Sequence, residues 1–551
     1  MNTDAKSNAE EPRLPKWKLI SLYVCICMGL FLSFLDTSIV ATAIFVIGSE
    51  FEALSQVNWV ALSYTLAYLG CTAIFASLSD VFGRRNIYIC VFVIFLAASL
   101  GCGWAQNVDQ LIVLRALQGI GGSGLYSVGF VILPEISPVR MLKMIGALAG
   151  IVLAMSGVLG PLLGGIITQY TTWRWIFWIN GPIGIGPLVL FAIAWPTDKE
   201  LVPRERRSIS QLDFVGFLLL IGASVPFVFA FQEAGIRVVM STNAWSAAVF
   251  VAPLVVGIVC WIALFGWEYL IHIRWSNSIG ALFPLRMARS KAYMSAVTST
   301  VLMGFPYLVI IYILPIRFQI VNGRSALASG IALLPMLGSV AVGSAIAGPI
   351  AMKVRNSVFF IMFTGAAMML IGTATLSTLT PESHDESKAY GLQVLVGLGF
   401  GLTISISSMI ASVENEPRDS AAAQGIMAQV RMFGGSIGIA VSTVILGTMQ
   451  RQQLLDTGII NPFQLASLHE VMSHLSDKEV LAIRKAYSDS FNKTLVVCSI
   501  ISGIALLLSV GFWEKKGSGT KDKLKQRAAR NAVGEAERGS VERKNPVISD
   551  A

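Results

Sequence analysis

Charged residues are scarce in this sequence. Asp, Glu, Lys and Arg make up 13% of its 551 residues, whereas apolar residues make up 54%, and the mean hydropathy is +0.69. Soluble globular domains carry about 25% charged residues, so that class is excluded and many membrane spans are expected. The net charge of +9 does not indicate a nucleic-acid partner. Its bases lie in loops and tails beside apolar runs, where they orient a membrane protein.

The patterns of catalytic and metal sites are also missing. The four histidines show no H-E-x-x-H or paired zinc spacing, and no phosphate-binding loop of the form G-x-x-x-x-G-K-[ST] occurs. The seven cysteines have no metal-ligand or redox spacing and are expected to be small buried hydrophobes. We therefore expect no enzyme activity, no metal and no cofactor. A protein of this kind draws on a gradient rather than on ATP, which argues against an ATP-driven pump.

Long apolar runs are what the sequence does have. A bilayer core about 30 Å thick needs roughly 20 helical residues, and fourteen runs reach that length. They predict an all-α polytopic membrane protein with fourteen transmembrane helices. The runs fall at about 19–46, 57–79, 87–105, 109–134, 142–169, 175–195, 213–233, 245–268, 292–316, 326–351, 357–379, 388–412, 420–448 and 493–513.

Basic residues fall in every second loop, which places those loops and both termini in the cytoplasm. The outer loop 449–490 is a tolerated exception, because its amphipathic part can lie on the membrane surface. Asn492 opens a formal glycosylation sequon, but it abuts the last span and is expected to be unused. The bases predicted to be cytoplasmic are Arg84, Arg85, Arg140, Lys143, Lys199, Arg204, Arg206, Arg207, Arg274, Arg286, Arg289, Lys353 and Arg355.

A faint internal repeat divides the chain. The segment 115–124 can be laid over 393–401 with glycines matched at a common offset. Duplication of this kind is typical of transporters built from two related halves, with the substrate site near the midplane between them. The predicted division is a cytoplasmic tail (1–18), a six-helix bundle (19–196), a linker with two extra spans (197–290), a second six-helix bundle (291–513) and a disordered cytoplasmic tail (514–551).

Two opposite charges are expected to meet inside the first half. Asp36 lies on the order of 25 Å in from the cytoplasmic end of the first span, and Arg115 lies on the order of 9 Å in from the outer end of the fourth. An intramembrane carboxylate is costly and is unlikely to face lipid. A purely structural ion pair is one interpretation. We favour the other, in which proton binding at Asp36 is coupled to movement and Arg115 sets the proton affinity.

The short loop between the second and third spans carries the order small-x-x-Asp-x-x-Gly-Arg-Arg, with Asp80, Gly83, Arg84 and Arg85. A simple positively charged cytoplasmic loop is one interpretation. The full order, however, resembles the signature loop of the major facilitator superfamily. The resemblance implies two six-helix bundles and a gate at the cytoplasmic ends of the helices, with Asp80 and the arginines as its latch.

The fifth span contains Gly157, Gly160, Pro161, Gly164 and Gly165 in the string Gly-x-x-Gly-Pro-x-x-Gly-Gly. Glycines allow close helix approach, and the proline bends the helix. The string resembles the antiporter motif of the same superfamily, which implies export in exchange for protons. With the aspartate motif of the first span and an aromatic segment at 173–182, the chain resembles the fourteen-span drug:proton antiporters over residues 19–513, although Gly181 replaces a larger apolar residue expected there.

Other polar and aromatic residues inside the spans are harder to place. Arg431 needs an acidic or carbonyl partner that the sequence does not identify, and structural anchoring is the favoured role. Gln319 falls in a segment that also looks like an outer turn of the family. The candidate residues of the substrate cavity are Phe34, Gln118, Tyr307, Gln319 and Gln393, with lipid-facing or core roles as the alternative for the aromatics.

Together these features predict a proton-coupled antiporter that expels amphipathic small molecules, such as drugs, toxins or secondary metabolites, by alternating access. Its partners would be the small-molecule substrate, protons and the lipid bilayer, and we expect a monomer. The plasma membrane is the expected location. Two alternatives stay open: a vacuolar transporter of basic amino acids with the same fold, and a non-transporting membrane sensor.

Overall fold

The computed structural model describes most of residues 15–512, and no β-strand occurs in this described part. Four predicted segments lie wholly or mainly outside it: the N-terminal tail, the bases of the linker at 199–207, the middle of the outer loop 449–490 and the C-terminal tail. Within 15–512, the residues not described are 41–42, 54–55, 57, 139–140, 197–207, 241–242, 276–277, 354–355, 381–384, 416–418 and 456–475.

Fourteen of the described helical segments are long and apolar enough to span a membrane, as expected from the fourteen runs. Helices suit this environment because they satisfy every backbone hydrogen bond internally. The first half contains α1 (Lys16–Ile39), α2 (Ile44–Glu50), α3 (Asn58–Phe82), α4 (Arg84–Gly103), α5 (Val108–Ile136), α6 (Leu142–Tyr170), α7 (Trp175–Trp178) and α8 (Asn180–Ala194). The inserted pair is α9 (Phe214–Met240) and α10 (Ala248–Arg274). The second half contains α11 (Lys291–Ile320), α12 (Ala326–Ile331), α13 (Leu334–Lys353), α14 (Ser357–Leu376), α15 (Asp385–Val413), α16 (Ser420–Gln450) and α19 (Asp477–Leu508).

Two boundaries differ from the sequence prediction. The first apolar run was expected to continue to residue 46, but α1 ends at Ile39 and the short α2 follows separately. The last span begins earlier than residue 493, because Ser476 and Glu479 form a capping box that starts α19 at Asp477. The C-terminal part of the predicted outer loop 449–490 is therefore helix.

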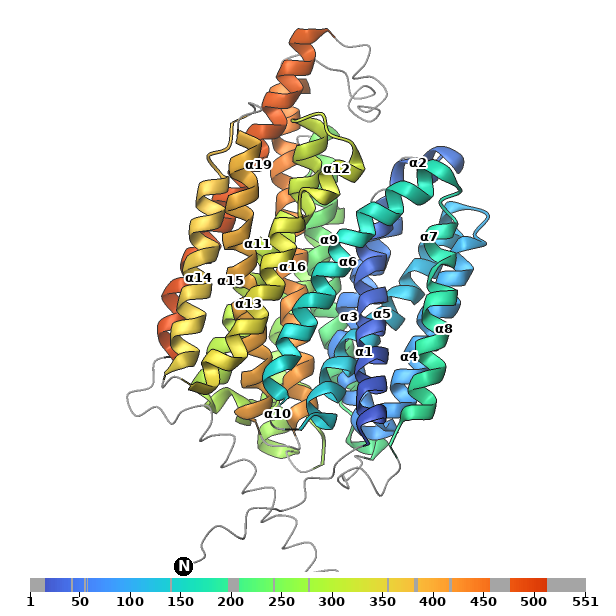
Figure 1. Cartoon of the computed structure of the whole chain (residues 1–551), viewed down its shortest axis with the longest axis vertical. Coiled ribbons are helices and arrows are strands. Elements are labelled where there is room, and N and C mark those ends of the chain that lie inside the picture. The colour runs from blue at the N-terminus through green and yellow to red at the C-terminus, as the bar shows by residue number, and fades with distance from the viewer. Residues whose placement is uncertain are drawn as a thin grey trace, which may run out of the picture.

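The six spanning helices of each half pack in the same pattern. In the first half α3 and α4 both pack on α5, while α1 packs on α6 and α8. In the second half α13 and α14 both pack on α15, while α11 packs on α16 and α19. Figure 1 shows the two bundles side by side. The weak sequence repeat thus corresponds to a repeat of helix packing.

The repeated glycines explain this correspondence. A side chain at Gly119 would lie 2.4 Å from the Tyr64 carbonyl oxygen of α3, and one at Gly121 would lie 2.6 Å from the Phe95 nitrogen of α4. A side chain at the matching Gly397 would lie 2.1 Å from the Met336 carbonyl oxygen of α13, and one at Gly399 would lie 2.5 Å from the Gly365 carbonyl oxygen of α14. In both halves, alternate glycines let the fourth span touch the second and third spans backbone to backbone.

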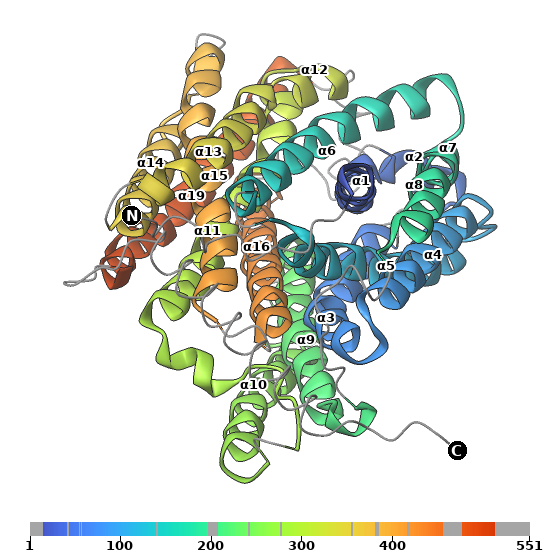
Figure 2. The same ribbon diagram turned by 60° about the horizontal axis from the view of Figure 1, so that its bottom comes forward.

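The bundles meet along two seams. On one, α6 packs against α13 and α15, and on the other α3 and α5 pack against α16. In Figure 2, α6 runs beside α13, while α16 lies beside α3 and α5. Helices α1, α5, α6, α11, α15 and α16 therefore surround the centre of the molecule.

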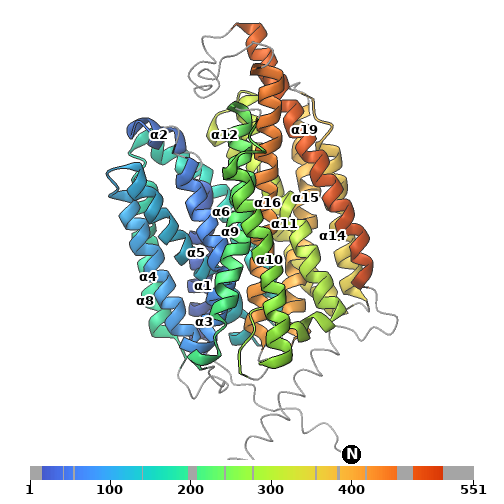
Figure 3. The ribbon, with the colours of Figure 1, turned by 180° about the vertical axis from the view of Figure 1, so that it is seen from behind.

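The inserted pair lies outside both bundles. Helix α9 packs on α16 and on α3, and α10 packs mainly on α9, as Figure 3 shows from behind. Only 11% of the most apolar stretch of α10 is buried. Its exposed Val, Ile and Phe side chains suit contact with lipid, so α10 is a peripheral helix.

Candidate functional site

A buried carboxylate and a buried guanidinium meet at the centre of the first bundle. Asp36 of α1 is 0% exposed and Arg115 of α5 is 1% exposed. Nη1 of Arg115 donates to Asp36 Oδ2 and, at 2.8 Å, to Gln118 Oε1. Nε2 of Gln118 donates to Asp36 Oδ1 at 2.8 Å. Both carboxylate oxygens therefore accept a hydrogen bond within one closed triad.

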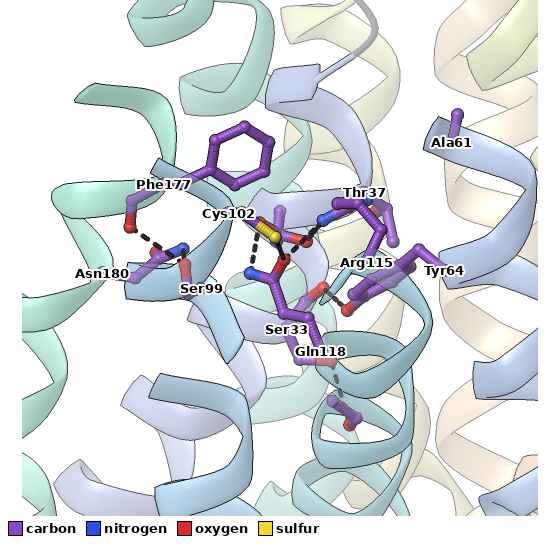
Figure 4. Close-up of polar contacts among 12 residues, drawn as sticks. Ser33, Thr37, Ala61, Tyr64, Ser99, Cys102, Arg115, Gln118, Phe177 and Asn180 are labelled. Atoms are coloured by element: carbon purple, nitrogen blue, oxygen red, sulfur yellow. Dashed lines mark hydrogen bonds and ion pairs between the residues drawn. The ribbon is translucent and has the colours of Figure 1, made fainter. Parts of the chain in front are cut away.

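A third hydrogen bond of Arg115 fixes the direction of its side chain. Nε of Arg115 donates to the Val60 carbonyl of α3 at 3.1 Å, and its guanidinium lies 4.3 Å from the centroid of the Tyr64 ring. The Tyr64 hydroxyl in turn donates to the Ser33 carbonyl of α1 at 2.9 Å. Figure 4 shows Arg115 and Gln118 of α5 converging with Tyr64 of α3. Three helices thus hold the charged pair.

The chain makes room for this arrangement with a glycine. A side chain at Gly122 of α5 would lie 2.5 Å from the Tyr64 hydroxyl. The tyrosine therefore occupies the space that any larger residue at position 122 would need. Gln118 follows Arg115 by three residues on the same face of α5, a spacing that makes helical neighbours. It was predicted as a cavity residue, and the structure places it in the triad.

The predicted cytoplasmic gate residues lie together at the ends of α3, α4 and α5. Nη2 of Arg84 bonds Asp80 Oδ1 and, at 3.0 Å, Glu135 Oε1, while Nη1 donates to Ser79 Oγ at 2.6 Å. The Arg84 side chain is 10% exposed. Gly83 adopts φ 87°, a left-handed conformation that lets α4 start directly after α3.

Sequence reasoning missed Glu135, the second carboxylate of this gate, because it follows Pro134 near the end of the fourth span, far along the chain. The second arginine of the gate acts separately. Nη2 of the exposed Arg85 donates to the Ala192 carbonyl at 2.9 Å, near the end of α8. The loop thereby connects α3, α4, α5 and α8 at one end of the first bundle.

The glycine string of α6 lies between α1 and the second bundle. A side chain at Gly160 would lie 1.9 Å from Ser38 Oγ, two residues after Asp36. A side chain at Gly157 would lie 3.2 Å from Leu337 of α13. Gly165 has no neighbour within 4 Å. The string therefore contacts both the Asp36 segment and the facing bundle.

A cavity lined by residues of both halves lies between the two bundles. Eight of its fourteen lining residues are apolar and non-aromatic. Phe34 and Tyr307, both predicted, line it, whereas Gln118, Gln319 and Gln393 do not. The six remaining lining residues are Phe34, Tyr126, Phe130, Tyr307, Phe400 and Arg431.

The partner of Arg431 is a phenol rather than the acid or carbonyl expected. Nη1 of Arg431 donates to the Tyr126 hydroxyl of α5 at 2.6 Å, and the guanidinium lies 5.7 Å from the Phe130 ring centroid. This bond crosses from the second bundle to the first. Another crossing, also unforeseen, is made by Gln429. Its amide donates to the Leu69 carbonyl at 2.8 Å and accepts from the Ala73 nitrogen at 3.3 Å.

The remaining predicted positions lie elsewhere. Gln319 is partly exposed in the last turn of α11. Gln393 is 0% exposed in α15, and neither its side-chain oxygen nor its nitrogen has a partner within the described part of the chain. Asn492 lies inside α19, and its Nδ2 donates to the Leu379 carbonyl at 3.0 Å. A side-chain nitrogen engaged in this way agrees with the expectation that the sequon is unused, which stays a prediction.

Comparisons with known proteins bear on the function. The model of the Major Facilitator Superfamily matches residues 26–439. The MFS-type transporter FPY5 of Fusarium mangiferae is 31% identical, over 90% of this chain and 84% of its own. The aspyridones efflux protein of Neocamarosporium betae is 29% identical, over 90% and 86%.

A similar solved structure is a bacterial homologue of the human lysosomal transporter Spinster in an inward-facing, unoccupied conformation. It covers 91% of this chain and 100% of its own with a TM-score of 0.56 and 15% identity. At that identity the likeness concerns the fold alone. The fold is therefore shared with a solved transporter.

Proposed function

Since the chain belongs to the Major Facilitator Superfamily and is a multi-pass membrane transporter, we propose that it exports amphipathic small molecules in exchange for protons. Relatives named as efflux proteins, such as the aspyridones efflux protein, support the direction of transport. The cargo would pass through the central cavity by alternating access of the two bundles. The protein would act as a monomer in the plasma membrane, with both termini in the cytoplasm.

The observation that carries this proposal is the closed triad of Asp36, Arg115 and Gln118. Charged groups buried in a membrane span are expensive and generally serve function. A proton on Asp36 turns one acceptor oxygen into a donor. The bond from Arg115 or Gln118 to that oxygen would then break, while rotation of the Gln118 amide would offer its own oxygen as the new acceptor. One proton would thus rearrange the contacts among α1, α3 and α5.

Aromatic rings connect the triad to the cavity. The ring of Tyr64 packs on the Arg115 guanidinium, and its centroid lies 5.8 Å from that of the Tyr68 ring. The Tyr68 centroid in turn lies 6.0 Å from that of Tyr126, which lines the cavity. Arg115 and Tyr126 are eleven residues apart on α5, about three helical turns, and so share one face. Movement of Arg115 would therefore be transmitted to the cavity through packed rings and a rigid helix.

Two further parts complete the mechanism. The latch of Asp80, Arg84 and Glu135 would hold the cytoplasmic ends of α3, α4 and α5 together and open in the alternate state. Gly160, Pro161 and Gly164 would serve as the packing hinge of α6 between α1 and α13. Both roles rest on the contacts of these residues in a single conformation.

A basic amino acid is a poorer cargo for this cavity. The described residues that line it include no carboxylate, and its one charged side chain is Arg431. The positively charged side chain of a basic amino acid would meet the Arg431 guanidinium in this cavity. We therefore do not favour the vacuolar basic amino acid transporter.

Flux measurements in liposomes test the proposal. Purified protein is reconstituted with a pH-sensitive dye inside, and amphipathic aromatic compounds are added one at a time. We expect substrate-dependent proton movement in wild type and none in Asp36→Asn. Glu233→Gln is the matched control, because Glu233 also bonds an arginine within a span, at 2.7 Å, but lies in α9.

The outcomes separate the parts of the proposal. Proton movement that persists in Asp36→Asn would keep antiport and remove Asp36 from the coupling. Substrate flux without proton movement in wild type would contradict antiport and leave a facilitator.

A further inference from the structure

The charged side chain that lines the central cavity is positive. Of the described residues that line it, Arg431 alone is ionic, and none is Asp or Glu. Asp36 is the nearest acid along α1, two residues after Phe34, but both of its oxygens already accept from Arg115 and Gln118. The cavity therefore offers positive charge and no free negative charge.

Two donors in the cavity wall lack partners. Nη2 of Arg431 is buried and has no hydrogen-bond partner among the described residues, and the same is true of the Tyr307 hydroxyl. Arg431 is 6% exposed and Tyr307 is 0% exposed. A buried donor without an acceptor costs free energy, and most so when it is charged. Such a pair of donors suits a ligand that brings its own acceptor oxygens.

The rest of the wall is suited to a flat body. Tyr307 of α11 and Phe400 of α15 stack with centroids 3.6 Å apart and planes 4° from parallel. On the facing bundle, Phe34 and Tyr126 meet edge to face at 5.3 Å. Aromatic walls of this kind favour planar apolar surfaces.

We propose that the cavity selects flat amphipathic molecules that carry an acidic oxygen group, such as a carboxylate or an acidic enol or phenol. This inference deepens the proposed function by naming the class of cargo. Nη2 of Arg431 binds the anionic oxygen in a charge-assisted hydrogen bond, the Tyr307 hydroxyl donates a second bond, and the rings enclose the apolar body. Neutral analogues lose the charged bond, and cations meet repulsion.

The place of Arg431 also connects binding to the contact between the bundles. Its Nη1 bonds Tyr126 of the first bundle, while Nη2 has no partner in the described part of the chain. An anion on Nη2 therefore sits where α16 meets α5, and binding changes the balance of charge at that junction. Arg431 is in this sense a specificity residue that contacts the cargo.

Binding of matched fluorescent probes tests the inference. The probes are 1-pyrenebutyrate (anionic), 1-pyrenebutanol (neutral) and 1-pyrenebutylamine (cationic), measured by equilibrium dialysis against protein in nanodiscs, with empty nanodiscs subtracted. We expect wild type to bind the butyrate about tenfold or more tightly than either analogue, the effect of one charge-assisted bond. Arg431→Gln is expected to remove this preference, and Tyr307→Phe to reduce it several-fold.

The matched control is Arg237→Gln, which removes the same charge from an exposed arginine outside the cavity and is expected to leave the preference intact. Equal or tighter binding of the amine by wild type would overturn the inference, as would an unchanged preference in Arg431→Gln. If Arg431→Gln does not fold, the wild-type ranking and Tyr307→Phe still decide. Because no gradient is applied, the result is independent of antiport, and proton-coupled flux of neutral or cationic cargo alone would refute this inference while leaving the proposed function intact.

Discussion

At the scale of single residues, the Asp36–Arg115 pair makes a prediction about stability. Replacing Arg115 with Met leaves the buried Asp36 carboxylate without its cation, and breaking such a pair costs about 3–5 kcal/mol. We expect Arg115→Met to lower the free energy of unfolding, measured by titration with a denaturing detergent, by this amount. Adding Asp36→Asn removes the stranded charge.

The double variant should therefore recover most of the lost stability while showing no proton coupling. A double variant as unstable as Arg115→Met would contradict this prediction. It would mean that the bond from Arg115 to Val60, or its contact with Tyr64, matters more than the ion pair.

Glu50 at the outer end of the first half makes a prediction about pH. It accepts from Trp173 Nε1 and Arg174 Nη1, both at 2.6 Å. Partial burial raises the pKa of Glu50, but the bonds from Arg174 and Trp173 and the charge of Arg174 outweigh it, so the pKa is lowered. A carboxyl with a lowered pKa stabilises the folded state above its unfolded pKa, and this stability is lost as the pH falls.

The melting temperature of wild type should therefore fall further between pH 6 and pH 4 than that of Glu50→Gln. The difference is expected to be small, because the Glu50 side chain is 43% exposed and water screens the pair. Glu52→Gln removes a carboxylate two residues away and is the control. Equal losses in wild type and Glu50→Gln would contradict the prediction.

At this scale the sequence could predict the charged pair of Asp36 and Arg115, but not the residues that surround it. Asp36 and Arg115 stand out as ions in apolar runs at similar depth, so their meeting was foreseeable. Tyr64, Tyr126 and Gln429 are ordinary residues within spans. Their contacts depend on which helices face each other, and no local pattern specifies that.

At the scale of helices, the packing of α6 on α1 makes a prediction about crowding. A methyl group at Gly160 would lie 1.9 Å from Ser38 Oγ and 2.7 Å from Ser38 Cβ. The oxygen can rotate away, but Cβ cannot, so α6 must shift. We expect Gly160→Ala to lower the free energy of unfolding by about 1–3 kcal/mol, as overpacking usually does, and to slow transport.

Gly165→Ala is the matched control, because it adds the same methyl group to the same helix with nothing within 4 Å. It should leave stability and transport at least as high as in wild type. Similar losses in both variants would show that flexibility of α6, rather than its close approach to α1, is what the glycines provide.

The repeat also shows where the halves differ. At the common offset that matches the glycines, Arg115 of α5 corresponds to Gln393 of α15. Arg115 bonds the carboxylate of Asp36, whereas both polar atoms of Gln393 lack partners among the described residues. Among the described residues, this matched position therefore carries an ion pair in the first half and none in the second, which is why we assign proton coupling to the first half. The repeat of the fold was visible in the sequence, but the lack of a hydrogen-bond partner for Gln393 among the described residues was not.

At the scale of the whole molecule, the number of spans and the inserted pair followed from apolar runs and basic loops. The position of α9 did not. It packs on α16 and α3, so it bridges a seam between the bundles. A side chain at Gly70 of α3 would lie 3.1 Å from Val225 of α9, and one at Gly235 of α9 would lie 2.9 Å from Thr443 Cγ2 of α16.

If the bundles rock against each other, α9 can move with only one of them. Its contact with α16 is the more extensive, and Arg451, just after α16, also donates to the Val238 carbonyl at 3.4 Å. We therefore expect α9 to move with the second bundle. In a chain whose seven native cysteines are replaced, crosslinking Gly235→Cys to Thr443→Cys should preserve transport. Crosslinking Gly70→Cys to Val225→Cys should stop it, and reduction should restore it. The reverse pattern would assign α9 to the first bundle, and loss of transport in both pairs would mean that α9 slides against each, so that the inserted pair is an independent moving part.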